Sequence, residues 1–331
     1  MPGLSDFPRR HVLSSMLAAT LGALVLPLCN SVRAQVPLPL TIIAPAGSGG
    51  GWDTAARALQ QVLNVTGIAR NVQVSNAPGA GGTVGLAQFA GNARGDGNQL
   101  LMTGFTMVGA VLVNQASTGL DAVTPIARLT DDPLVVVVPL DAPYQTLSAL
   151  AAAMKADTGK IAWAGGSAGG PDHILAGLMT KAAGGDPSKL DYRPFSGGGD
   201  ALAELLSGRV TAGISGYNEF ESQIKAGKLR ALGVSTAQRI DGVAIPTLKE
   251  GGLNVTLSNW RGVMGAPGLN EGQRAALSSA VYRALSSPEW ARIRQARKWT
   301  DAYLSPDDFA AFLKAEQIRV REALSAIGLI R

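Results

Sequence analysis

The chain has 331 residues, with 29 basic and 24 acidic side chains and a formal net charge of +5. Its only cysteine is Cys29 and its only histidines are His11 and His173, which excludes a disulfide framework, a cysteine-based zinc site and a histidine-rich metal cluster. The one basic run, residues 292–298, is typical of the solvated face of a helix, so nucleic acid is not an expected partner.

The first 34 residues are predicted to be an export signal. A pair of arginines at 9–10 precedes an apolar stretch at 12–28, and residues 32–34 form a small-residue cleavage site. Cleavage near Ala34 would remove the cysteine and one histidine. It would leave 29 − 3 = 26 basic and 24 − 1 = 23 acidic residues, a net charge of +3. We therefore expect a periplasmic protein without thiols.

After the signal, β-rich runs alternate with helical patterns, which is typical of an α/β protein with mostly parallel sheets. The 331 − 34 = 297 remaining residues are enough for two domains of roughly 100–150 residues each. In chain order, strands are expected at 40–43, 72–74, 99–103, 134–138, 160–164, 210–214 and 229–234.

The first strand leads into a glycine-rich loop at 44–53 that opens directly into a helix. That helix carries apolar residues on one face up to Leu63 and is expected to stop near Gly67. A glycine loop followed by a helix start leaves backbone N–H groups unpaired at the positive end of the helix dipole. This pattern predicts a site for an anion.

A second unit is expected to begin with the apolar run 134–138, which suits a strand buried on both faces. It contains another glycine-rich loop, 165–173, which also opens into a helix. The chain is expected to return to the first unit after Asn254 and to end with a helix that includes 309–324. The two loops could face each other across a cleft and hold one acidic ligand.

The second loop also fits the nucleophile elbow G-x-S-x-G of hydrolases, with Ser167 as the nucleophile. The only histidine left after cleavage, His173, follows six residues later on the next helix, whereas the hydrolase base lies far downstream. A periplasmic serine esterase therefore remains an alternative to simple capture. No catalytic residue, metal or cofactor is predicted.

Several other side chains allow two interpretations. Asp53 and Asp172 fall in the first turn of a helix, where each either compensates the helix dipole or orients loop amides or a water for the ligand. Trp52 and Trp260 either belong to the core or form walls of the cleft. Arg261 is the best candidate for a cation near the ligand.

Seven segments, taken in order, resemble one family of substrate-binding proteins. They are GSGGGWDTAAR at 47–57, NAPGAGG at 76–82, GSAGGPDHI at 166–174, FSGGGDAL at 195–202, GKLRAL at 227–232, PTLKEG at 246–251 and NWRGV at 259–263. Together they are similar to the substrate-binding proteins of tripartite tricarboxylate transporters, the Bug or TctC-like family. The resemblance covers essentially the whole chain after the signal.

The resemblance implies a two-lobed periplasmic binding protein that closes on its ligand and delivers it to membrane subunits of the transporter. In the family, carboxylates are held by backbone amides and bridging waters from loops that correspond here to 46–53 and 167–172. The Gly-Gly-Gly-Trp-Asp and Trp-Arg-Gly elements resemble the tricarboxylate-type branch, which suggests a citrate-like di- or tricarboxylate. Pro171 departs from the family pattern, because many relatives have a small hydroxyl residue there. A sensor for a membrane receptor kinase is a further alternative.

We therefore expect a monomeric α/β protein with a periplasmic-binding-protein fold and a cleft between its two lobes. Domain 1 is predicted at 36–133 and 255–331, and domain 2 at 134–254. The predicted ligand-binding residues are Ser48, Gly49, Gly50, Gly51, Trp52, Asp53, Asn76, Phe105, Thr106, Ser167, Ala168, Gly169, Gly170, Asp172, Tyr217, Asn218, Trp260 and Arg261.

Overall fold

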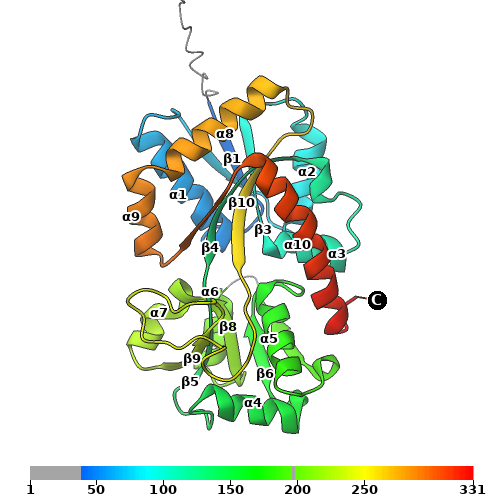
Figure 1. Ribbon diagram of the computed structural model, residues 1–331, viewed down its shortest axis with the longest axis vertical. Helices are drawn as coiled ribbons and strands as arrows, with labels where there is room; N and C mark the ends of the chain where they lie inside the picture. Colours follow the sequence, from blue (N-terminus) through cyan, green and yellow to red (C-terminus); the bar gives the residue numbers. More distant parts are fainter. Residues whose placement is uncertain (1–38, 196–197, 331) are drawn as a thin grey trace, which may run out of the picture. The chain divides into compact units, whose positions relative to one another are not determined.

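The computed structural model describes residues 39–195 and 198–330 (Figure 1). The predicted export signal at 1–34 lies outside the described residues. Within those residues, none of the helices combines the length and the apolar character that a membrane crossing requires.

A six-stranded sheet contains the strands from both ends of the described chain, in the order β11-β4-β10-β3-β1-β2. β1 pairs in parallel with β2 and β3, whereas β10 runs antiparallel between β3 and β4. The strands are β1 (Thr41–Ala44), β2 (Gln73–Asn76), β3 (Gln99–Gly104), β4 (Thr124–Asp132), β10 (Asn259–Gly265) and β11 (Thr300–Leu304).

The middle of the chain forms a five-stranded sheet in the order β7-β6-β8-β5-β9. β6 is parallel to β7 and β8, and β5 is antiparallel to β8 and β9. The strands are β5 (Leu134–Pro139), β6 (Ala162–Gly165), β7 (Asp191–Pro194), β8 (Ala212–Gly216) and β9 (Leu229–Val234).

The predicted α/β fold with two helix-flanked sheets is confirmed, but both sheets are mixed. Parallel pairing is confined to the neighbours of β1 and β6. The antiparallel pairs all involve β4, β5 or β10. β4 continues into β5 with only Pro133 between them, so one extended segment serves both sheets, as Figure 1 shows.

Ten α-helices are found in the described residues, and they flank the two sheets (Figure 1). Four short 3-10 turns lie at Ala80–Gly82, Leu120–Ala122, Thr158–Lys160 and Pro187–Lys189. The helices are α1 (Gly51–Val65), α2 (Thr83–Asn92), α3 (Phe105–Val113), α4 (Leu147–Ala156), α5 (Pro171–Ala182), α6 (Gly198–Leu206), α7 (Tyr217–Lys225), α8 (Glu271–Leu285), α9 (Pro288–Ala296) and α10 (Pro306–Ala326).

The two helices that follow the glycine loops start without a side-chain cap. Gly50 precedes α1 and Gly170 precedes α5, and neither has a side chain that could accept a first-turn N–H. A Ser, Thr, Asp or Asn in that position would normally satisfy one of these donors. Both helices instead obtain their stability from packing, with Leu59 and Ile174 fully buried.

Candidate functional site

Both predicted glycine loops line one cavity of about 320 Å³. Seven of the predicted ligand-binding residues lie on its wall: Gly50, Gly51, Trp52, Thr106, Ser167, Asp172 and Arg261. The remaining lining residues are Pro45, Ala46, Gly47, Pro78, Gly79, Ala80, Gly81, Gly82, Asp132, Gly166, Pro171, Gly198, Ser215, Gly216, Glu219 and Asn259. A chamber with this lining is small enough to enclose a short-chain metabolite.

The first loop is held in shape from behind by Asp53. Its Oδ2 atom accepts the Gly49 N–H at 2.8 Å, and its Oδ1 atom accepts Asn76 Nδ2 at 2.8 Å. Arg57 pairs with both oxygens at 2.9 Å. Burial raises the pKa of Asp53, but the bonds from Arg57, Gly49 and Asn76 together outweigh it and bring the pKa below its usual value. Asp53 therefore organises the loop and does not line the cavity.

Three donors at the start of α1 remain available. The N–H groups of Gly51, Trp52 and Asp53 have no acceptor within the described part of the chain. Gly51 and Trp52 lie on the cavity wall, and the Trp52 ring packs so closely on Gly82 that a Cβ there would lie 2.7 Å from it. The positive end of α1 thus faces the cavity with unpaired donors.

The second loop is braced by its own side chains. Gly166 donates its N–H to Asp172 Oδ2 at 2.7 Å, and the Gly166 carbonyl accepts the hydroxyl of Tyr192 at 2.8 Å. The Tyr192 ring stacks on His173, with centroids 4.0 Å apart and planes at 1°. Because Pro171 has no N–H, the first turn of α5 retains only the amides of Asp172 and His173 as free donors among the described residues.

The N–H of Gly169 is not a free donor. It bonds to Nδ1 of His173 at 3.2 Å, and neither Ala168, Gly169 nor Gly170 lies on the cavity wall. Gly170 donates to the Ser167 carbonyl at 2.9 Å. The amides of Gly169 and Gly170 are therefore bonded within the turn itself. The sequence could not predict this, because only the folded loop brings their acceptors into place.

The geometry gives the esterase alternative no support. Burial lowers the pKa of His173 to about 4, and its Nδ1 atom already accepts the Gly169 N–H. Within residues 39–195 and 198–330, Ser167 makes no hydrogen bond to His173. A serine nucleophile needs a base within hydrogen-bond reach.

Four charged side chains line the cavity, and the sequence pointed to only two of them. Arg261 donates to Asp132 at 2.5 Å, with both side chains almost fully buried. Glu219, in the first turn of α7, accepts the Ser215 hydroxyl, and burial raises its pKa. Asp132 and Glu219 lie outside any recognisable motif, since only the crossing of β4 into β5 and the start of α7 bring them to the site.

Each of these charges is packed against a glycine. A Cβ on Gly51 would lie 2.6 Å from Arg261 Nη2, and one on Gly216 would lie 2.8 Å from Asp132 Oδ2. A Cβ on Gly165 would lie 2.8 Å from Asp172 Cβ, and one on Gly198 would overlap the Glu219 carboxylate. The glycines therefore make room for buried charges as well as shaping turns.

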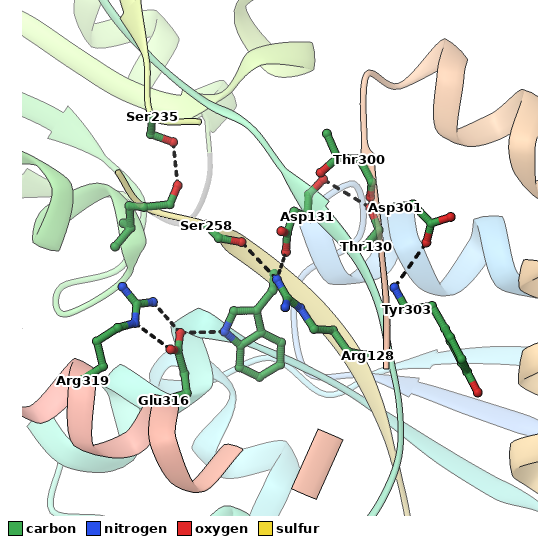
Figure 2. Close-up of polar contacts among 12 residues, drawn as sticks. Arg128, Thr130, Asp131, Ser235, Ser258, Thr300, Asp301, Tyr303, Glu316 and Arg319 are labelled. Carbon is green, nitrogen blue, oxygen red and sulfur yellow. Dashed lines mark hydrogen bonds and ion pairs between the residues drawn. The ribbon is translucent and has the colours of Figure 1, made fainter. Parts of the chain in front are cut away.

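The other predicted residues lie away from the cavity wall. Trp260 is fully buried and donates its indole N–H to Glu316 at 2.9 Å, and Figure 2 shows Glu316 with its partner Arg319. Asn218 donates to Asp132 Oδ1 at 3.2 Å. Ser48 is exposed, Phe105 lies in the core under the Arg319 guanidinium, and Tyr217 bonds to Glu221.

A second cavity, of about 520 Å³, lies where Trp260, Glu316 and Arg319 meet the end of β4. Four of its charged side chains are paired with one another: Arg319 with Glu316 at 2.7 Å, and Arg128 with Asp131 (Figure 2). Its other charges, Arg239 and Asp132, pair with Glu250 and Arg261 outside it. Neither glycine loop contributes to it. The first cavity is therefore the better candidate for ligand binding.

Curated relatives and solved structures match most of the chain. It is 31% identical over 291 residues to a protein of the TAR-I ttuE-ttuC' intergenic region of Agrobacterium vitis, covering 85% of this chain and 83% of the relative. It is 30% identical over 284 residues to BugT of Bordetella pertussis, covering 84% and 86%.

Among solved structures, MatC from Rhodopseudomonas palustris with bound malate is 25% identical, with a TM-score of 0.73 and coverage of 86% and 98%. An R. palustris protein solved with adipate has a TM-score of 0.79 at 22% identity, covering 88% and 99%. The model of the tripartite tricarboxylate transporter family receptor matches residues 55–329. The chain belongs to this family of periplasmic solute-binding receptors.

Proposed function

We propose that the protein captures a small di- or tricarboxylate in the periplasm and delivers it to the membrane subunits of a tripartite tricarboxylate transporter. The observation that carries this proposal is the cavity into which α1 directs the unpaired N–H groups of Gly51 and Trp52. Family membership and the malate bound to MatC support a carboxylate ligand.

The affinity required is within reach of hydrogen bonds alone. A micromolar Kd corresponds to about 8 kcal/mol. Hydrogen bonds to a charged group contribute roughly 1.5–3 kcal/mol each. Four or five such bonds, from first-turn amides and the side chains of Thr106 and Arg261, offset the cost of immobilising the ligand. No catalytic residue, metal or cofactor is needed for capture.

We further propose that the lobes comprise 36–133 with 255–331, and 134–254, and that the protein works as a monomer. The strand order supports this division, because β1–β4, β10 and β11 share one sheet and β5–β9 share the other. Cleavage near Ala34 would release the protein into the periplasm. Docking onto a receptor kinase is the competing assignment, and deletion of the transporter genes would separate the two, since only transport depends on them.

A thermal-shift screen tests the capture proposal. The panel is malate, succinate, citrate, adipate, glutamate and an aromatic acid, with the purified protein at pH 6. We expect at least one di- or tricarboxylate to raise the melting temperature and to be recovered unchanged. Consumption of the ligand, or turnover of a generic ester that Ser167→Ala abolishes, would instead establish an enzyme.

A further inference from the structure

The cavity holds more carboxyl groups than cations. Asp132, Asp172 and Glu219 line it together with the single guanidinium of Arg261, which is already paired with Asp132. If all three acids were ionised, a dicarboxylate would enter a chamber with a net charge of −2. Like charges that share one poorly solvated site repel each other strongly.

Asp172 differs from its counterpart in the first loop. Each glycine loop has an aspartate that accepts one of its own amides, Asp53 from Gly49 and Asp172 from Gly166. Asp53 has a counter-ion four residues later, Arg57, whereas the residue four positions after Asp172 is an alanine. Asp172 is only 7% exposed, lines the cavity, and its Oδ1 atom has no donor among residues 39–195 and 198–330.

The groups around Asp172 also favour its neutral form. Glu219 of α7 and Asp132 of β4 add negative charge, Arg261 of β10 is engaged by Asp132, and Tyr192 of β7 is a neutral phenol. Its neighbour His173 is buried and uncharged at neutral pH, since burial holds the pKa of that imidazole near 4. Burial, followed by the charges of Glu219 and Asp132, raises the pKa of Asp172 to about 7.

We propose that Asp172 binds the ligand in its protonated form, donating from its free carboxyl oxygen to a ligand carboxylate, so that capture is coupled to uptake of a proton from solvent. This inference rests on the proposed carboxylate function. Oδ2 would keep its bond from Gly166, and the proton would reside on Oδ1, the oxygen that has no donor among the described residues.

The coupling has a defined sign. An anionic ligand favours the protonated acid, so the pKa of Asp172 rises further in the complex. Well below pH 7 the acid is already protonated and affinity is full. Above pH 7 the free protein must first take up a proton, so Kd should weaken about tenfold between pH 7 and pH 8.5.

Isothermal titration with malate tests this inference. The carboxyl groups of malate are ionised above pH about 6, so the ligand does not itself titrate between pH 6.5 and 9. Titrations at pH 7.5 in two buffers of different ionisation enthalpy should show net uptake approaching one proton per malate bound. Adipate serves as a second probe.

Asp172→Asn is the matched variant, because its amide oxygen can accept from Gly166 while its amide N–H donates toward the ligand. We expect it to bind malate with a Kd that is constant from pH 6.5 to 8.5, without proton uptake. Asp307→Asn, at a carboxylate that is 89% exposed and off the cavity wall, should keep the pH dependence of the wild type.

The outcomes distinguish the proton coupling from the capture function. Binding without proton uptake, or an unchanged pH dependence in Asp172→Asn, would overturn the proton coupling and leave capture standing. Proton release with tighter binding at high pH would show that the acids accept from a cationic ligand group instead. Failure of both malate and adipate to bind at pH 6 would overturn the dicarboxylate function itself.

Discussion

At the scale of single residues, the cavity is a set of charges fitted against glycines. The Arg261 guanidinium occupies the space where a Gly51 side chain would be, and Asp132 fixes it there. Since that guanidinium is a long side chain and not backbone, it can be displaced without unfolding the protein. A change at Gly51 should therefore affect the ligand more than the fold.

We predict that Gly51→Ala weakens carboxylate binding about tenfold, equivalent to about 1.4 kcal/mol, while stability changes by less than about 1 kcal/mol. Titration calorimetry and urea unfolding measure the two quantities. Gly91→Ala is the control, because a Cβ at that helical position meets nothing within 4 Å. Equal affinities for Gly51→Ala and wild type would show that the guanidinium position is irrelevant to the ligand.

Residue-scale prediction from sequence reached only part of the site. The glycine loops and Arg261 were identifiable because a loop before a helix start and an isolated arginine have a general chemical meaning. Asp132 and Glu219 were not, because nothing in their local sequence distinguishes them from surface acids. Trp260 was ambiguous, and its buried bond to Glu316 on α10 arises from a contact 56 positions away.

At the scale of elements, the contact between α5 and β7 determines the shape of the second loop. His173 stacks on Tyr192 and accepts the Gly169 N–H, so its imidazole must remain neutral. Its pKa is lowered by burial from 6.5 to about 4, so the stability it contributes is present above pH 6.5 and is lost as pH falls toward 4. Asp172 has a raised pKa, so its contribution to stability instead becomes more favourable as pH falls from 7 to 4.

We predict that His173→Asn removes the loss of stability that the imidazole causes at acid pH, because the Asn side chain keeps an acceptor near Gly169 without titrating. Between pH 7 and pH 4.5, wild type should lose about 2–3 kcal/mol relative to the variant. Urea unfolding at both pH values gives the difference, and the lost ring stacking cancels because it is the same at each pH. Parallel pH profiles for the two proteins would contradict the buried, neutral imidazole.

Strands with strong apolar runs were predictable, and among the edge strands β2 and β9 were predicted whereas β7 and β11 were not. The run that became β5 was found because all its central residues are apolar and buried. β7 and β11, whose burial patterns contain no fully buried residue, gave no such signal. β4 was missed because charged residues interrupt it at Arg128 and near its end.

At the scale of the whole molecule, helix α3, which follows the six-stranded sheet's β3, packs against the second glycine loop. Gly109 of α3 packs directly on the carbonyl of Gly169, and Val113 of the same helix would meet a Cβ on Gly169 at 2.7 Å. Since α3 follows β3 of the six-stranded sheet and Gly169 follows β6 of the five-stranded sheet, this backbone contact links the two halves.

We predict that Gly109→Ala lowers the free energy of unfolding by about 1–3 kcal/mol, because a methyl group would overlap the Gly169 carbonyl and backbone cannot move aside cheaply. Gly91→Ala, on the neighbouring helix, should instead gain up to about 1 kcal/mol from helix propensity. Chemical denaturation of both variants provides the comparison. A stabilised Gly109→Ala would mean that the contact is not maintained in solution.

Sequence predicted a return to the first unit after Asn254, and that division into domains stays a prediction; β10 and β11 pair in the six-stranded sheet. It could not predict that β10 is inserted between β3 and β4, because insertion depends on pairing partners more than 100 residues distant. Long-range pairing of this kind leaves little trace in local periodicity.

The packing of the four cavity charges against glycines has a consequence for laboratory evolution. Side chains at Gly51, Gly198 and Gly216 would collide with a charged group, and one at Gly165 with the Tyr192 hydroxyl and Asp172 Cβ, before they reached a new ligand. Libraries that aim to change ligand selectivity should therefore leave these glycines unchanged. They should instead vary four other wall residues, Ala46, Pro78, Thr106 and Asn259, where a substitution displaces no buried charge.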